Sequence, residues 1–180
     1  MEITERTDQC CAQKKYDAIV ATHIFLIAAA ASFYLASHIP EILYTGQDID
    51  VWYNADANRV FRHMHTAYNA RDLLLHPLFS LFMRPFAQGI TLLGLTTGEA
   101  STLVVAASAG AVAALLFLTV RGLHLSGLNA GLICAMFVVS GSFTFWWSIV
   151  ETFPIGAVTI SLLFLILVND VRSPGLWAVA

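Results

Sequence analysis

Long apolar segments constrain this chain more than any other feature. They run over 18–36, 100–120 and 128–149, and a shorter one covers 154–168. Because a helix rises 1.5 Å per residue, about 20 apolar residues cross the roughly 30 Å hydrocarbon core of a bilayer. Inside that core the backbone must hydrogen-bond within the protein, as it does in helices. The sequence therefore predicts an all-α, polytopic integral membrane bundle with about four or five apolar segments.

The composition agrees with a membrane protein and excludes other classes. Hydrophobic residues make up 58% of the chain and charged residues only 12%, whereas soluble domains carry about 25% charged residues. No basic stripe is present, so nucleic acid is not an expected partner, whereas membrane lipid is. Three cysteines in such a chain do not indicate a disulfide framework.

The charges near the first apolar segment predict the orientation of the chain. Residues 1–17 are polar and include both lysines, Lys14 and Lys15. Positive residues beside a span favour the cytoplasmic side, and no cleavage site follows the span, which we interpret as retained. We expect a cytoplasmic tail over 1–17, then a single membrane domain over 18–180 in the plasma (inner) membrane, with an external loop over about 39–72.

The segment 73–95 allows two arrangements, because Pro77 and Arg84 interrupt an otherwise apolar run. If the segment crosses the membrane, Arg121 lies outside and Glu151 inside. If it lies in the interface, Arg121 joins the N-terminal lysines inside and Glu151 lies outside, beside the acidic loop. The positive-inside rule favours the second arrangement.

The polar loop contains an expected interfacial helix over 56–75. Val60 and Met64 fall at helical spacing, and Asp56 can accept a hydrogen bond from a backbone N–H as the N-cap. A helix of this mixed composition is expected to lie on the membrane surface rather than across it.

Two short motifs in this region carry a resemblance. The stretch Asp56-Ala-Asn-Arg59 and the element His76-Pro-Leu are similar to the N-terminal module of the GT-C superfamily of polytopic membrane glycosyltransferases. Members have a first span, an external loop with an acidic residue and a nearby arginine, and a His-Pro element that enters the membrane. Glu151 lies where many members carry another acidic residue. Since members have ten or more spans, the resemblance implies a relative or an N-terminal portion.

The resemblance implies transfer of a sugar from a polyprenyl-phosphate donor on the external face. Asp56 is the expected catalytic base for the acceptor hydroxyl, supported by Glu151. Arg59, Arg62 and His76 are the expected substrate-binding residues, because guanidinium groups bind phosphate in a bidentate manner.

A divalent metal ion is a further candidate, since it can bridge carboxylate and phosphate oxygens. Asp48 and Asp50 are the expected ligands. The cofactor requirement stays open at this point, because a pair of aspartates in a polar loop is also typical of a solvated segment.

Each of the other candidates also has a purely structural interpretation. Asp56 can serve only as a helix cap, His76 can precede a helix start, and Arg59 and Arg62 can extend to lipid headgroups. The alternative function is a non-enzymatic membrane protein, such as a lipid-carrier handling or transporter subunit. A transporter would carry polar residues in the middle of several spans, whereas here the polar residues gather outside them.

Overall fold

The computed structural model describes residues 2–39, 57–65 and 77–170, and side chains from residue 11 onward within the first helix. This part of the chain is all-helical. Its seven helices are α1 (Glu2–Ser37), α3 (Ala57–His65), α5 (Pro77–Leu92), α6 (Thr97–Gly122), α7 (Gly127–Val138), α8 (Gly141–Trp146) and α9 (Phe153–Asp170).

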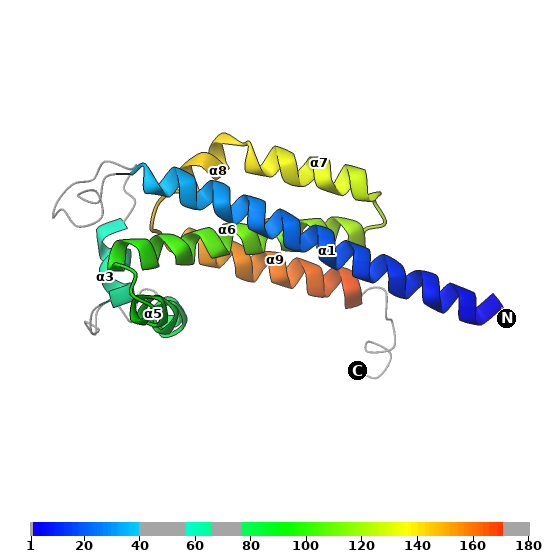
Figure 1. The fold of residues 1–180 in the computed structure, drawn as a ribbon, viewed down its shortest axis with the longest axis horizontal. Coiled ribbons are helices and arrows are strands. Elements are labelled where there is room, and N and C mark those ends of the chain that lie inside the picture. The colour runs from blue at the N-terminus through cyan, green and yellow to red at the C-terminus, as the bar shows by residue number, and fades with distance from the viewer. Residues whose placement is uncertain (1, 40–56, 66–76, 171–180) are drawn as a thin grey trace.

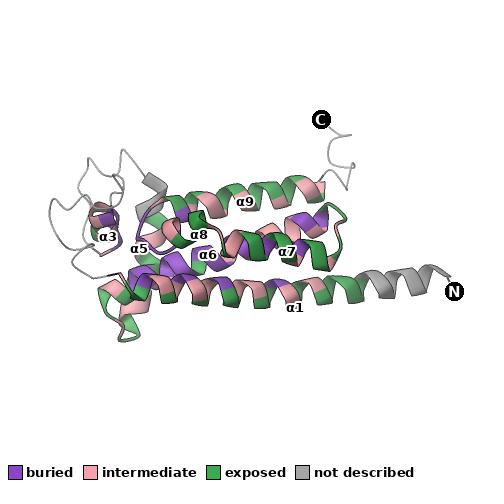
Figure 2. Cartoon of the chain, turned by 90° about the horizontal axis from the view of Figure 1, so that it is seen from above, coloured by how far each residue is buried: buried purple, intermediate pink, exposed green. Residues whose placement is uncertain are grey.

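Three of these helices are long and apolar enough to cross a membrane. They contain the apolar stretches Cys11–Ser37, Thr97–Gly122 and Phe153–Asp170, which confirms the predicted membrane-protein class in its broad form. In Figure 1, α1, α6, α7 and α9 run side by side along the long axis of the molecule. Among the described helices, α6 carries the most buried residues, and α1 and α9 pack along it (Figure 2).

The contact between α1 and α6 depends on small side chains. Ala28 of α1 is fully buried against Ala109 and Ala113 of α6. At Gly110 an added Cβ would stand 2.6 Å from the backbone oxygen of Phe25. Helices in lipid associate through such close packing, since burial from water does not drive them together.

The prediction of one continuous span over 128–149 is wrong. α7 ends at Val138, and the separate short helix α8 begins at Gly141. Ser140 causes the break, because its Oγ accepts a hydrogen bond from the Phe143 N–H at 3.1 Å as the N-cap of α8. With 12 residues, α7 is shorter than the roughly 20 residues that cross a bilayer.

The predicted helical segment over 73–95 is represented by α5, which has 16 residues and contains Pro85. Figure 1 views α5 nearly end-on while the long helices run across the picture, so α5 lies crosswise at one end of the bundle. Its Ala87 is buried against the other helices, whereas Phe82 and Phe86 are exposed. This crosswise placement agrees with the interfacial arrangement rather than with a span.

The two ends of the bundle differ in their charged groups. At the end from which α1 starts, Arg121 of α6 forms a two-pronged ion pair with Asp17 of α1, with N–O distances of 2.9 and 3.2 Å. Arg121 also donates to the carbonyl of Leu125 in the following turn. The opposite end carries α3, α5 and the turn before α9 (Figure 1). Arg121 therefore lies toward the N-terminal end, and Glu151 lies at the far end with α3.

Candidate functional site

The helix α3 is held on the far end of the bundle by one apolar face. Ala57, Val60 and Met64, spaced three and four residues apart, are buried against Val105 of α6 and Ala87 of α5. This spacing places all three on one side of the helix. The predicted helix over 56–75 is thus described over Ala57–His65, and residues 66–75 lie outside the described part.

A hydrogen bond joins the end of α3 to α6. The Nε2 of His65 lies 2.7 Å from the Oγ of Ser101, and the His65 ring packs against Phe61 with centroids 5.1 Å apart. Burial lowers the pKa of His65 below its usual value, and a backbone hydrogen bond with Thr97 opposes this shift. The imidazole is therefore mostly neutral at pH 7, which suits a hydrogen bond to a hydroxyl.

Glu151 lies in the turn before α9 and is buried, with 5% of its surface exposed. Its Oε2 accepts a hydrogen bond from the Thr152 N–H at 2.7 Å. The preceding residue, Val150, belongs to the apolar cluster that holds Val60 and Met64 of α3. The structure therefore places a hydrogen-bonded carboxylate inside the protein, next to the cluster that holds α3.

The structure gives the predicted arginines different exposures. Arg59 is half-buried, and Arg62 is exposed, both on α3. The structure brings Arg59, Arg62 and Glu151 to the same end of the bundle, although α3 and the turn before α9 are about 90 residues apart in the sequence.

The other predicted site residues lie outside the described part of the chain. They are Asp48, Asp50, Asp56 and His76. Within the described ranges, no group of three or more His, Cys, Asp or Glu side chains is arranged to hold a metal ion. The metal hypothesis for Asp48 and Asp50 therefore stays a prediction.

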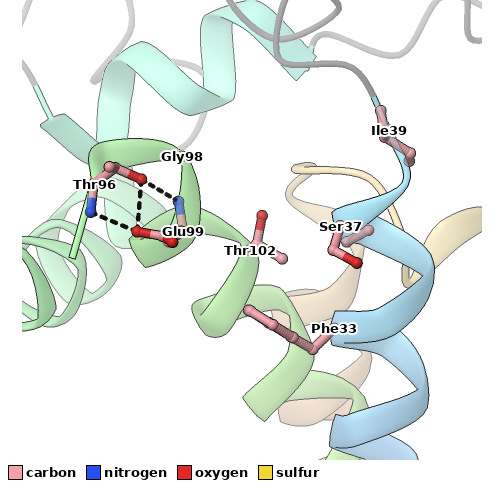
Figure 3. A pocket seen from close by; sticks show the side chains of 8 residues that line it. Phe33, Ser37, Ile39, Thr96, Gly98, Glu99 and Thr102 are labelled. Carbon is pink, nitrogen blue, oxygen red and sulfur yellow. Dashed lines mark hydrogen bonds between the residues drawn. The ribbon is translucent and has the colours of Figure 1, made fainter.

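A hollow that the sequence did not indicate lies at the same end, between the end of α1 and the start of α6. Its volume is about 160 Å³, and its lining includes Phe33 and Ser37 of α1 and Thr96, Glu99 and Thr102 at the start of α6 (Figure 3). Thr96 and Glu99 form a capping box, in which the Thr96 Oγ1 accepts from the Glu99 N–H at 3.2 Å. The Thr-x-x-Glu pattern before an apolar run is the sequence signal for this box.

Similarity to known proteins gives no family for this chain. Comparisons of the chain with protein-family models, with curated proteins and with solved structures found no match.

Proposed function

We propose that the chain is a membrane glycosyltransferase-like protein, or the N-terminal portion of one, that transfers a sugar from a polyprenyl-phosphate donor. The observation that carries the proposal is the burial of Glu151 beside α3, the helix on which Arg59 and Arg62 lie. A carboxylate and two guanidinium groups at one end of an apolar bundle would supply a group that supports the catalytic base, together with phosphate ligands, at the depth of lipid headgroups.

The form of the donor suits this arrangement. A polyprenyl phosphate has a long apolar chain, which the exposed apolar surfaces of α5 and α9 would accompany in the bilayer. Its phosphate would lie at the end of the bundle, within reach of Arg59 and Arg62. We place this end on the external face of the plasma membrane, because Arg121 and the N-terminal lysines then face the cytoplasm.

The proposed reaction is a single displacement at the anomeric carbon of the donor sugar. The acceptor hydroxyl gives its proton to Asp56 and its oxygen bonds to that carbon. The bond from the carbon to the phosphate oxygen breaks, and polyprenyl phosphate leaves with its charge stabilised by Arg59. Glu151 supports the basic group, His76 contributes to substrate binding, and Asp48 and Asp50 are the candidate ligands of a divalent ion.

A transfer assay tests the proposal. The protein in lipid nanodiscs would be given C55 polyprenyl phosphate carrying radiolabelled glucose, mannose or arabinose, with a membrane lipid extract as the source of acceptors. Transfer is measured as label that leaves the donor lipid. We expect Asp56→Asn to lower the rate about 10²- to 10⁴-fold, the usual contribution of a general base.

The matched control is Asp170→Asn, which makes the same change at the end of α9 that lies away from α3. It is expected to keep the wild-type rate. Equal rates for Asp56→Asn and the wild type would refute the assigned base. Binding of the donor without transfer to any acceptor would instead favour a lipid-carrier handling protein.

A further inference from the structure

The hollow between α1 and α6 contains a hydroxyl group that has no hydrogen-bond partner among the described residues. Thr102 is 8% exposed, and Figure 3 shows its hydroxyl directed into the hollow. Within the described residues this hydroxyl makes no hydrogen bond, whereas Ser108 on the same helix bonds back to the Val104 carbonyl at 2.8 Å. The Thr102 oxygen is not among the fully buried atoms that lack a partner, so it is accessible from the hollow and available to a bound molecule.

The neighbouring polar atoms offer mainly hydrogen-bond acceptors. The Oγ of Ser37 donates to the Tyr34 carbonyl at 2.7 Å, which leaves its lone pairs to accept. The Oε2 of Glu99 accepts from the backbone N–H and the hydroxyl of Thr96, at 2.8 and 2.9 Å. These bonds fix the carboxylate through Oε2, and Oε1 makes no hydrogen bond among the described residues. A ligand of this hollow must therefore supply hydrogen-bond donors.

The lining also excludes one class of ligand. No lysine, arginine or histidine lines the hollow as the structure describes it, and the Glu99 carboxylate repels anions, so phosphate does not fit. Phe33 provides an apolar wall, on which the C–H face of a sugar ring can pack. The volume of about 160 Å³ corresponds to about five water molecules in the liquid, so the hollow suits a small polar molecule the size of one sugar ring.

We infer that this hollow is a subsite for a single neutral sugar ring. Thr102 would donate to and accept from its hydroxyls, and Glu99 and Ser37 would accept from them. Ser101, the neighbour of Thr102, is bonded to His65 of α3, so the subsite adjoins the helix that carries Arg59. Its role as the position of the acceptor sugar rests on the proposed function, whereas the binding of a free sugar does not.

Ligand-observed saturation-transfer NMR on the full chain in nanodiscs tests the subsite without any transfer reaction. The probes are D-glucose, D-mannose and D-galactose. Inorganic phosphate and ethylammonium serve as comparison ligands that represent an anion and a cation. We expect at least one sugar to bind and Thr102→Val, which keeps the side-chain shape, to weaken that binding at least tenfold. Thr119→Val makes the same change near the other end of α6 and is expected to bind as the wild type does.

A second variant protects the test against misfolding. Thr102→Ser retains the hydroxyl, and we expect it to keep sugar binding within about threefold. Equal sugar binding by Thr102→Val and the wild type would overturn the subsite. Binding of phosphate in place of sugar would also overturn the subsite. Binding of ethylammonium in place of sugar would do the same, provided that Glu99→Gln abolishes it.

The subsite and the proposed function fail in different ways. Sugar binding that depends on Thr102, in a protein that transfers no label, refutes only the proposed function. Transfer that depends on Asp56, with sugar binding unchanged in Thr102→Val, overturns only the subsite.

Discussion

His65 makes the docking of α3 sensitive to pH. Because burial lowers its pKa below the ordinary value of 6.5, the undocked form takes up a proton at a higher pH than the docked form does. The docked state is therefore fully stabilised above pH 6.5, and this stability falls as the pH drops below it toward the folded pKa. We expect the thermal unfolding temperature to decline over that range.

The variant His65→Gln separates this effect from general acid denaturation. Glutamine can still hydrogen-bond the Ser101 hydroxyl but does not titrate, so the decline below pH 6.5 should become shallower. His23→Gln, at an exposed position of α1, is the matched control and should keep the wild-type slope. Parallel pH profiles for wild type and His65→Gln would contradict the assignment.

For individual residues, the sequence predicted which side chains gather at one end better than it predicted which side chains contact one another. Arg59, Arg62 and Glu151 are expected site residues from the GT-C resemblance and from the affinity of guanidinium groups for phosphate, and they lie at one end of the bundle. The partnership of His65 with Ser101 links residues 36 positions apart, and no local pattern encodes such a pairing. The position of Thr102 at the hollow was missed for the same reason, since the surroundings of one threonine in an apolar run depend on the neighbouring helix.

Among the elements, the α1–α6 pair gives the sharpest test of packing. An alanine at Gly110 would place its Cβ 2.6 Å from the backbone oxygen of Phe25, so the helices must separate. We expect Gly110→Ala to destabilise the protein by about 1–3 kcal/mol, the typical cost of overpacking. The measurement is thermal unfolding in detergent, followed by circular dichroism.

Gly131→Ala in α7 provides the matched control. An added Cβ there meets no atom of the described residues within 4 Å, and alanine favours helix over glycine by up to about 1 kcal/mol. The control should be neutral or slightly stabilising. An equal loss of stability in both variants would show that the cost comes from glycine replacement in general rather than from the Phe25 contact.

The ends of the apolar spans were predicted well where apolar runs end at polar residues, although α1 itself extends back to Glu2 through the expected polar tail, and they were predicted poorly where the runs do not end at polar residues. The expected spans 18–36, 100–120 and 154–168 correspond to the apolar parts of α1, α6 and α9. The run 128–149 contains only small or hydroxylated residues at its centre, Ser140 and Gly141, and hydropathy does not register a helix cap. The break between α7 and α8 therefore depends on the local hydrogen bond of Ser140, which a hydropathy pattern does not show.

For the whole molecule, the arrangement predicts which residues share a side of the membrane. Single cysteines at 56 and 153 would be labelled with an impermeant thiol reagent, in a background lacking the three native cysteines. Position 153 is chosen because Phe153 is exposed, whereas Glu151 is buried. In the proposed orientation the loop before α3 and the start of α9 face the outside, so both positions should label in intact cells, and a cysteine at position 15 should label only after permeabilisation.

Labelling of position 153 only after permeabilisation would mean that the segment containing α5 crosses the membrane. Glu151 would then be separated from the loop that carries Asp56, and the proposed catalytic group would be wrong. The sequence alone left this choice to a few charges, whereas the crosswise placement of α5 gives an independent reason for the interfacial arrangement.

The shortness of α7 has a consequence for how the protein enters the bilayer. Its 12 residues rise only about 18 Å, well under the roughly 30 Å of hydrocarbon, so α7 is a poor substrate for insertion by itself. It instead rests on α6, where Ala130 and Cys134 are buried beside Phe117. Because synthesis proceeds from the N-terminus, α1 and α6 are made before α7, and we expect them to provide the surface on which α7 packs.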